Sequence, residues 1–142
     1  MGLYDQAKFI ANTYNVYVEC DRLVLFSMSF LPSKENREKA DRFLSNRPDY
    51  RGQAETSCGK ELIRLGLEKA EQELSAEQIR EIWDIVSQRL VAAASGNVTA
   101  FADGADFRST FVRIELPGLL QNKEVKTINH QDKFLFASTF DL

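Results

Sequence analysis

The polar residues in the last third of the chain could cleave RNA without a metal ion. Ser109, Arg113 and Glu115 lie at odd positions of one stretch, and His130, the single histidine of 142 residues, follows in a polar segment. Such cleavage needs a base for the 2′-hydroxyl proton, an acid for the leaving oxygen and a cation beside the charged phosphorane. Histidine titrates near neutral pH. We therefore predict His130 and Glu115 as the acid–base pair and Arg113 as the phosphate ligand, with Ser109 beside them, provided that these groups converge. Otherwise His130 is an exposed turn residue and Arg113–Glu115 a surface pair.

A second constellation points to NAD instead of RNA. It combines Tyr50-Arg51-Gly52 with Ser109-Thr110-Phe111. The set resembles that of ADP-ribosyltransferases, in which an arginine holds the NAD phosphates beside a Ser-Thr-like strand and a catalytic glutamate. The resemblance implies that Arg51, Ser109 and Thr110 bind NAD. The glutamate departs from the pattern, because Glu115 follows Ser109 by only six residues.

Several other kinds of site are absent from the sequence. Neither common glycine-rich phosphate loop occurs, and no nucleophile elbow accompanies the histidine. One histidine with Cys20 and Cys58 does not fit a zinc site, and no acidic ladder matches a calcium loop. We therefore expect no metal and no bound cofactor. Two cysteines so far apart in the sequence give no disulfide framework, which favours either a reducing compartment or a core that needs no disulfides.

The secondary structure expected around these residues changes from helix to strand along the chain. Ser75-Ala-Glu-Gln78 is a capping box, and the apolar spacing behind it predicts a helix over 76–94, with Gly96 as its left-handed C′ residue. After Asn97 the period changes to that of strands. The expected elements are strands over 98–101, 109–115, 125–128 and 134–140, turns over 103–106 and 129–132, and a short helical turn at 119–120.

The first half of the chain is mostly helical in composition. We expect helices over 5–14, 33–45 and 60–67, one or two buried strands within 16–31 ended by Pro32, and a loop over 46–59. Residues 1–142 are therefore predicted to form a single α+β domain. Its helix-rich N-terminal two-thirds should pack on a small, mostly antiparallel C-terminal sheet.

Charge and hydropathy limit the partners of the chain. The net charge of −3 argues against a broad DNA-coating surface but leaves room for a local basic cleft. The longest nearly unbroken apolar run, 23–31, is too short for a membrane span, and the N-terminus lacks the pattern of a signal peptide. We therefore expect no membrane span.

The later part of the chain carries a family resemblance. Its segments 83–101, 109–117 and 122–128 resemble the C-terminal effector domains of polymorphic bacterial toxins, those of contact-dependent growth inhibition and Rhs-type proteins. The resemblance implies a delivered toxin that acts in the bacterial cytoplasm and is bound by an immunity protein. A ribonuclease, often against transfer RNA, is the commonest activity of such domains, and NAD consumption is the next. The alternative from another class is a non-catalytic immunity protein or inhibitor, whose acidic surface would steer onto a basic toxin.

Overall fold

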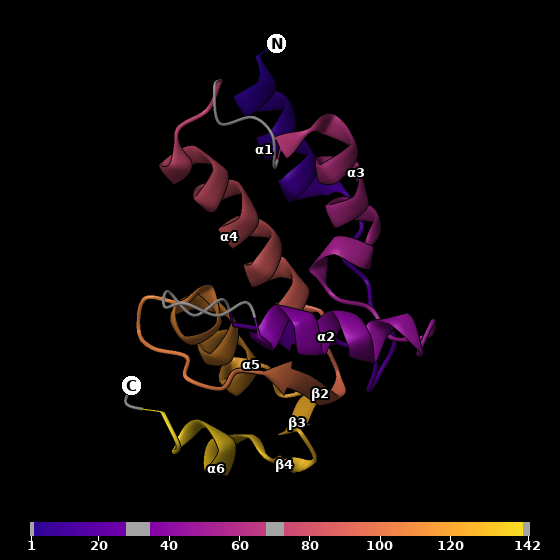
Figure 1. The fold of residues 1–142 in the computed structure, drawn as a ribbon, viewed down its shortest axis with the longest axis vertical. Helices are drawn as coiled ribbons and strands as arrows, with labels where there is room; N and C mark the ends of the chain where they lie inside the picture. The colour runs from indigo at the N-terminus through magenta and orange to yellow at the C-terminus, as the bar shows by residue number, and fades with distance from the viewer. Residues whose placement is uncertain (1, 28–34, 68–72, 141–142) are drawn as a thin grey trace.

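The computed structural model describes residues 2–27, 35–67 and 73–140, which form an α+β fold (Figure 1). This confirms the predicted fold class. The predicted stop at Pro32 and helix start at Ser33 lie outside the described residues. The elements, in chain order, are α1 (Leu3–Thr13), β1 (Val24–Phe26), α2 (Glu35–Ser45), the 3₁₀ turn η1 (Gln53–Glu55), α3 (Ser57–Leu65), α4 (Ala76–Ala92), β2 (Gly96–Phe101), the π-helical turn η3 (Phe111–Glu115), α5 (Leu116–Gln121), β3 (Val125–Ile128), β4 (Gln131–Asp132) and α6 (Lys133–Ala137).

The four strands form one mixed sheet in the order β1-β2-β3-β4. β1 pairs with β2 and β2 with β3 in parallel, and only the short β4 pairs antiparallel, with β3. The prediction of a mostly antiparallel sheet was therefore wrong. Parallel neighbours need long crossover connections, and here the helical η3–α5 segment connects β2 to β3. The strands predicted at 98–101 and 125–128 are confirmed.

Helix α4 links the two ends of the molecule (Figure 1). It runs from the end that holds α1 and α3 to the sheet. The predicted capping box is present: Ser75 Oγ accepts from the Gln78 N–H at 3.1 Å, and Gln78 Oε1 accepts from the Ser75 N–H at 2.9 Å. Gly96 does not cap the helix. It is instead the first residue of β2 and has a φ of +76°. A Cβ atom at this position would lie 2.0 Å from Asp21 Oδ1.

Two segments predicted as strands are helical. Residues 109–115 alternate between apolar and polar, but the buried side chains of this segment and the next follow the spacing of a helix. These buried residues are Phe111, Val112, Glu115, Leu116 and Leu119. In 134–140 the carboxylate of Asp132 accepts from the N–H groups of Phe134 and Leu135 and so caps α6. The helical burial and the cap override the strand-like alternation.

One hydrophobic cluster of buried residues extends from Ala7 in α1 to Ala137 in α6. Phe111 lies fully buried in this cluster, with its ring centroid 6.3 Å from that of Phe136 and 6.0 Å from that of Phe140. These contacts hold α6 against η3, the turn that ends at Glu115. Within the described residues, none of the helices has the length and apolar character needed to cross a membrane.

Candidate active site

A cleft of about 500 Å³ opens between β1, α2, η1, α4 and the segment that precedes α5. This volume lies in the usual range of small-ligand sites. The lining combines one buried carboxyl, three arginines, one tryptophan, hydroxyl groups and apolar strand residues. It consists of Val24, Leu25, Phe26, Arg37, Gln53, Ala54, Arg80, Trp83, Ser87, Arg108, Thr110 and Glu115.

Glu115 is the buried acid of this cleft. Only 6% of its surface is exposed, although it ends the π-helical turn η3 beside the open space. Burial raises the pKa of its carboxyl from 4.5 to about 7; a hydrogen bond from Ser87 acts against the shift, and the charge of Asp84 adds to it. π-Helical turns occur frequently at functional sites. A carboxyl that titrates near neutral pH inside a cleft is a candidate catalytic group.

The three arginines give the cleft a positive charge in a protein of net charge −3. Arg80 Nη2 donates to the carbonyl of Arg108 at 3.4 Å, so these two side chains come from neighbouring parts of the lining. Arg108 is held by Asp106 at 2.7 Å, and Arg37 lies 4.0 Å from Asp41. Guanidinium groups match phosphate oxygens in geometry and charge. The cleft is therefore suited to a phosphorylated ligand.

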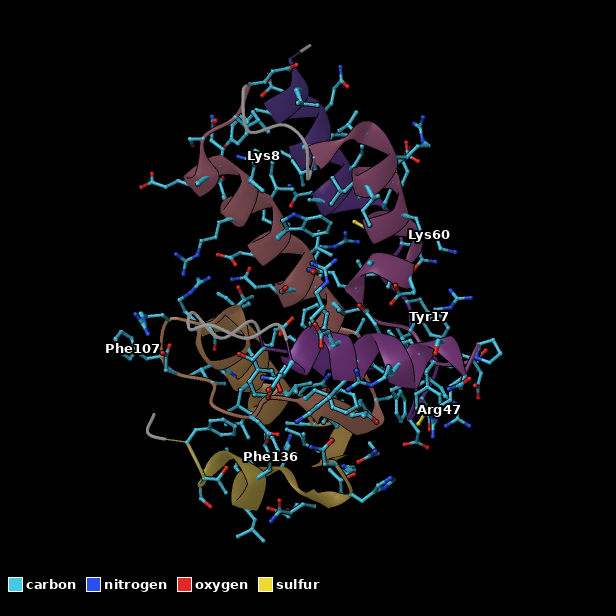
Figure 2. All side chains as sticks on the ribbon, viewed as in Figure 1. Lys8, Tyr17, Arg47, Lys60, Phe107 and Phe136 are labelled. Atoms are coloured by element: carbon cyan, nitrogen blue, oxygen red, sulfur yellow. The ribbon has the colours of Figure 1, made fainter. Side chains whose placement is uncertain are left out.

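Trp83 offers a flat apolar surface in the same cleft. It is partly buried and packs against the core while also lining the open space. A tryptophan face attracts a cationic ring. Phe107, 73% exposed, precedes Arg108 and points outward from the molecule (Figure 2). Trp83 and Phe26 are therefore the aromatic residues of the cleft lining, and Phe107 lies outside it.

Hydrogen bonds from Gln53 to Trp83 and Ser87 connect η1 to α4. The side-chain amide of Gln53 donates to Ser87 Oγ at 3.0 Å and to the backbone carbonyl of Trp83 at 3.2 Å. Ser87 is 1% exposed, and its hydroxyl lowers the pKa of the Glu115 carboxyl. Polar contacts thus link η1 to α4 beside the buried acid.

The acid–base group predicted from the sequence is not assembled. His130 lies exposed in the turn between β3 and β4 with φ +63°, and its backbone N–H donates to Asn97 Oδ1 at 2.8 Å. Of the four predicted catalytic residues, only Glu115 lines the cleft. The predicted residues do not lie together because the strand expected at 109–115 is a helical turn, whose side chains point in several directions.

Arg113 and Ser109 have structural contacts instead. The Arg113 guanidinium forms a two-bond ion pair with Asp84, at 3.0 Å for each bond. Ser109 is 3% exposed; its Oγ donates to the Asp106 carbonyl and accepts from the Val112 N–H at the start of the helical segment. Neither residue lines the cleft, so neither side chain is placed to contact a phosphate there.

The NAD-binding set predicted around Arg51 is also not assembled. The exposed Arg51 forms an isolated parallel bridge with Leu23 and lines a separate small hollow beside Tyr17. Thr110 does line the cleft, whereas its neighbour Ser109 is buried in the contacts described above. The cleft arginines come from α2, α4 and the segment before η3 rather than from the Tyr50–Gly52 stretch.

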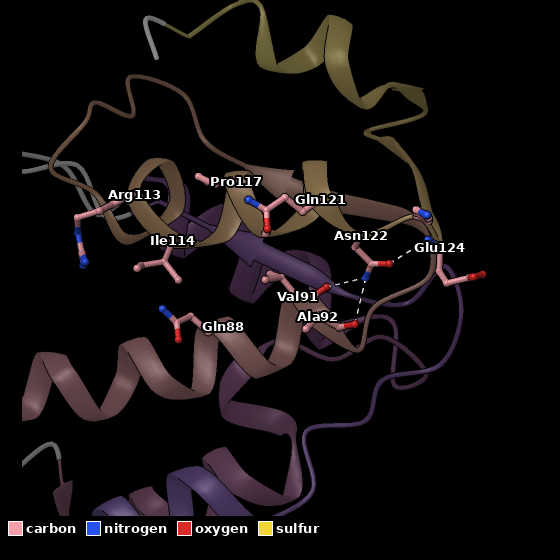
Figure 3. Close-up of a pocket in the computed structure, with 11 residues that line it drawn as sticks. Gln88, Val91, Ala92, Arg113, Ile114, Pro117, Gln121, Asn122 and Glu124 are labelled. Atoms are coloured by element: carbon pink, nitrogen blue, oxygen red, sulfur yellow. Dashed lines mark hydrogen bonds between the residues drawn. The ribbon is translucent and has the colours of Figure 1, made fainter.

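A larger hollow of about 690 Å³ lies where α4 meets α5 (Figure 3). Two of its polar side chains, those of Asn122 and Arg113, are already engaged by the protein. The Asn122 amide donates to the carbonyls of Val91, Ala92 and Ala94 and so caps the end of α4, and Arg113 is paired with Asp84. This hollow joins two helices and, despite its size, is less suited to chemistry than the cleft at Glu115.

Sequence reasoning missed Arg80, Trp83, Ser87 and Gln53. A signal was present in α4, where Arg80, Trp83 and Ser87 follow one another at steps of three and four residues and therefore share one face of the helix. Both Trp83 and Ser87 can line a site on that face. No comparable local signal marks Gln53, which reaches α4 from a 3₁₀ turn 30 residues earlier.

No family model and no curated protein matches the chain. Among solved structures, a variant of ADP-ribosyl cyclase aligns with a TM-score of 0.55 and 14% identity over 78% of this chain. Porcine CD38, in a complex with the covalent intermediate ribo-F-ribose-5′-phosphate, aligns with a TM-score of 0.60 and 20% identity over 88% of this chain. The alignments cover 48% of the cyclase and 66% of CD38. The chain therefore shares its fold with part of each of these two proteins.

Proposed function

We propose that this chain cleaves the bond between the ribose C1′ atom and the nicotinamide nitrogen of NAD, with Glu115 as the catalytic carboxylate. The observation that carries the proposal is the buried Glu115 carboxyl in a cleft that also holds Trp83 and three arginines. The shared fold supports the same reading, because its neighbours are an ADP-ribosyl cyclase and a CD38 that holds a covalent ribose 5-phosphate intermediate.

The lining supplies the groups that this reaction needs. The C1′–N bond breaks with its electron pair leaving on nicotinamide, and positive charge develops at C1′. Ionised Glu115 stabilises that charge at close range inside a partly desolvated site. Trp83 stacks on the cationic nicotinamide ring of the substrate. Arg80 and Arg108 bind the diphosphate. Water then adds to C1′ to give ADP-ribose and a proton.

Incubation of the purified chain with NAD, and in parallel with total RNA, tests the proposal. We expect nicotinamide and ADP-ribose to appear in equal amounts by chromatography, while the RNA stays intact. The variant His130→Ala is the matched control and should cleave NAD at the original rate, because His130 lies outside the cleft. Intact NAD beside fragmented RNA would overturn the proposal and favour a ribonuclease.

From the resemblance of segments 83–101, 109–117 and 122–128 to polymorphic toxin domains, we also propose that NAD consumption makes the chain a toxin of the bacterial cytoplasm, with an immunity protein as partner. Induced expression in bacteria should then lower cellular NAD before growth stops. Glu115→Gln should remove this effect and His130→Ala should preserve it, at matched protein levels. Harmless expression of the folded chain would contradict the toxin proposal and favour the inhibitor class.

A further inference from the structure

The backbone carbonyl that would usually accept the Ser87 hydroxyl proton is already occupied. A serine inside a helix commonly donates its hydroxyl proton to the backbone carbonyl four residues earlier, which for Ser87 is that of Trp83. In this chain the Trp83 carbonyl accepts from Gln53 Nε2 at 3.2 Å. As part of α4 it also accepts the backbone N–H of the next turn. Both lone pairs of this carbonyl are therefore used.

The same amide fixes the direction of the Ser87 proton. Gln53 Nε2 donates its other hydrogen to Ser87 Oγ at 3.0 Å. The orientation of the amide follows from the chemistry, because the Trp83 carbonyl can only accept and must face the NH₂ group. Ser87 thus accepts from Gln53 and has one proton left to donate. Ser87 and Glu115 line the same cleft, and the Ser87 hydroxyl lowers the pKa of the Glu115 carboxyl.

We propose that Gln53 is a positioning residue of the cleft: by occupying the Trp83 carbonyl and the Ser87 oxygen, it directs the Ser87 hydroxyl proton onto the Glu115 carboxylate. Its effect on catalysis rests on the proposed cleavage of NAD. Its effect on the carboxylate does not, because the contacts exist in the free chain.

Other charged groups also affect the ionisation of Glu115, and they do so independently of Gln53 and Ser87. Asp84 on α4 opposes ionisation of Glu115 and is itself held by Arg113. Arg80 and Arg108 line the cleft with Glu115, and so does Arg37 from α2. None of these groups contacts Gln53 in the hydrogen bonds that link η1 to α4. Removing the Gln53 amide should therefore change the hydrogen bond to Glu115 and leave the surrounding charges in place.

The test is a titration of the Glu115 carboxyl by ¹³C NMR in the substrate-free protein, with Glu115→Gln to assign the signal. Gln53→Leu should raise the Glu115 pKa by about one pH unit, because a charged group loses a hydrogen bond. Ser87→Ala should give a similar rise, and the double variant should add little to either. The low-pH limb of kcat/KM for NAD should move by the same amount. Gln88→Leu, on the next position of α4 but outside the cleft lining, is the control and should leave both unchanged.

A folded Gln53→Leu variant with an unmoved Glu115 titration would overturn the proposal, and so would fully additive shifts of the two single variants. If Gln53→Leu does not fold, Gln53→Asn shortens the amide by one methylene and carries the same expectation. A chain that fails to cleave NAD but shows the coupled titration shifts would remove the proposed function while keeping Gln53 as the positioning residue.

Discussion

Replacing Glu115 by glutamine is expected to slow the cleavage of NAD by roughly a thousandfold or more, the scale of losing a preorganised electrostatic contact to the transition state. The amide keeps the volume of the side chain and its capacity to accept from Ser87. It lacks the negative charge that stabilises the positive charge developing at C1′. The loss should therefore appear in kcat, while binding of NAD is preserved.

Two measurements separate these effects. Release of nicotinamide reports the rate, and fluorescence reports binding, because Trp83 is the single tryptophan of the chain and lines the cleft. The expected variant is quenched by NAD as the original chain is, yet releases almost no nicotinamide. Glu124→Gln is the matched control, since Glu124 is exposed and lies in the other hollow. A Glu115→Gln variant with the original rate would exclude Glu115 as the catalytic carboxylate.

The same substitution should stabilise the folded chain at high pH. The pKa of Glu115 is raised from 4.5 to about 7 by burial, so the folded state holds this proton more tightly than the unfolded state. The stability contributed by the protonated carboxyl is fully present below pH 4.5 and is lost as the pH rises to about 7. Glutamine cannot ionise and avoids this loss, which amounts to about 3 kcal/mol.

Urea unfolding of both proteins across this pH range measures the difference. Relative to Glu115→Gln, the original chain should lose stability between pH 4.5 and about 7 and then stay lower by a constant amount. The control Glu124→Gln should follow the original chain, because an exposed carboxylate is solvated in both states. Parallel stability curves for the original chain and Glu115→Gln would show that the carboxyl titrates normally. A gain in stability with a loss of activity is the usual trade-off at catalytic groups.

The long helix was predicted well because local interactions hold its start: Ser75 and Gln78 cap α4 through bonds only three residues apart. β3 also matches its predicted range Val125–Ile128, although it pairs with the distant strand β2. The segments at 109–115 and 134–140 were assigned wrongly because the local alternation of apolar and polar residues favours a strand. Burial of Leu116 and Leu119, and the cap at Asp132, decided for helices.

The sequence by itself determined the α+β class, the long helix with Trp83 on its face and Glu115 as a candidate catalytic acid. NAD was among the substrates that it raised. Only the tertiary structure decided which groups surround the acid: Gln53 and Ser87 replace His130 and Ser109, and arginines from three separate segments replace Arg113 and Arg51. The physical reason is the distance along the chain over which the interactions act. Capping and periodicity act over a few residues, whereas a catalytic cleft forms where side chains distant in the chain come within hydrogen-bond distance, and that depends on how the helices and sheet pack.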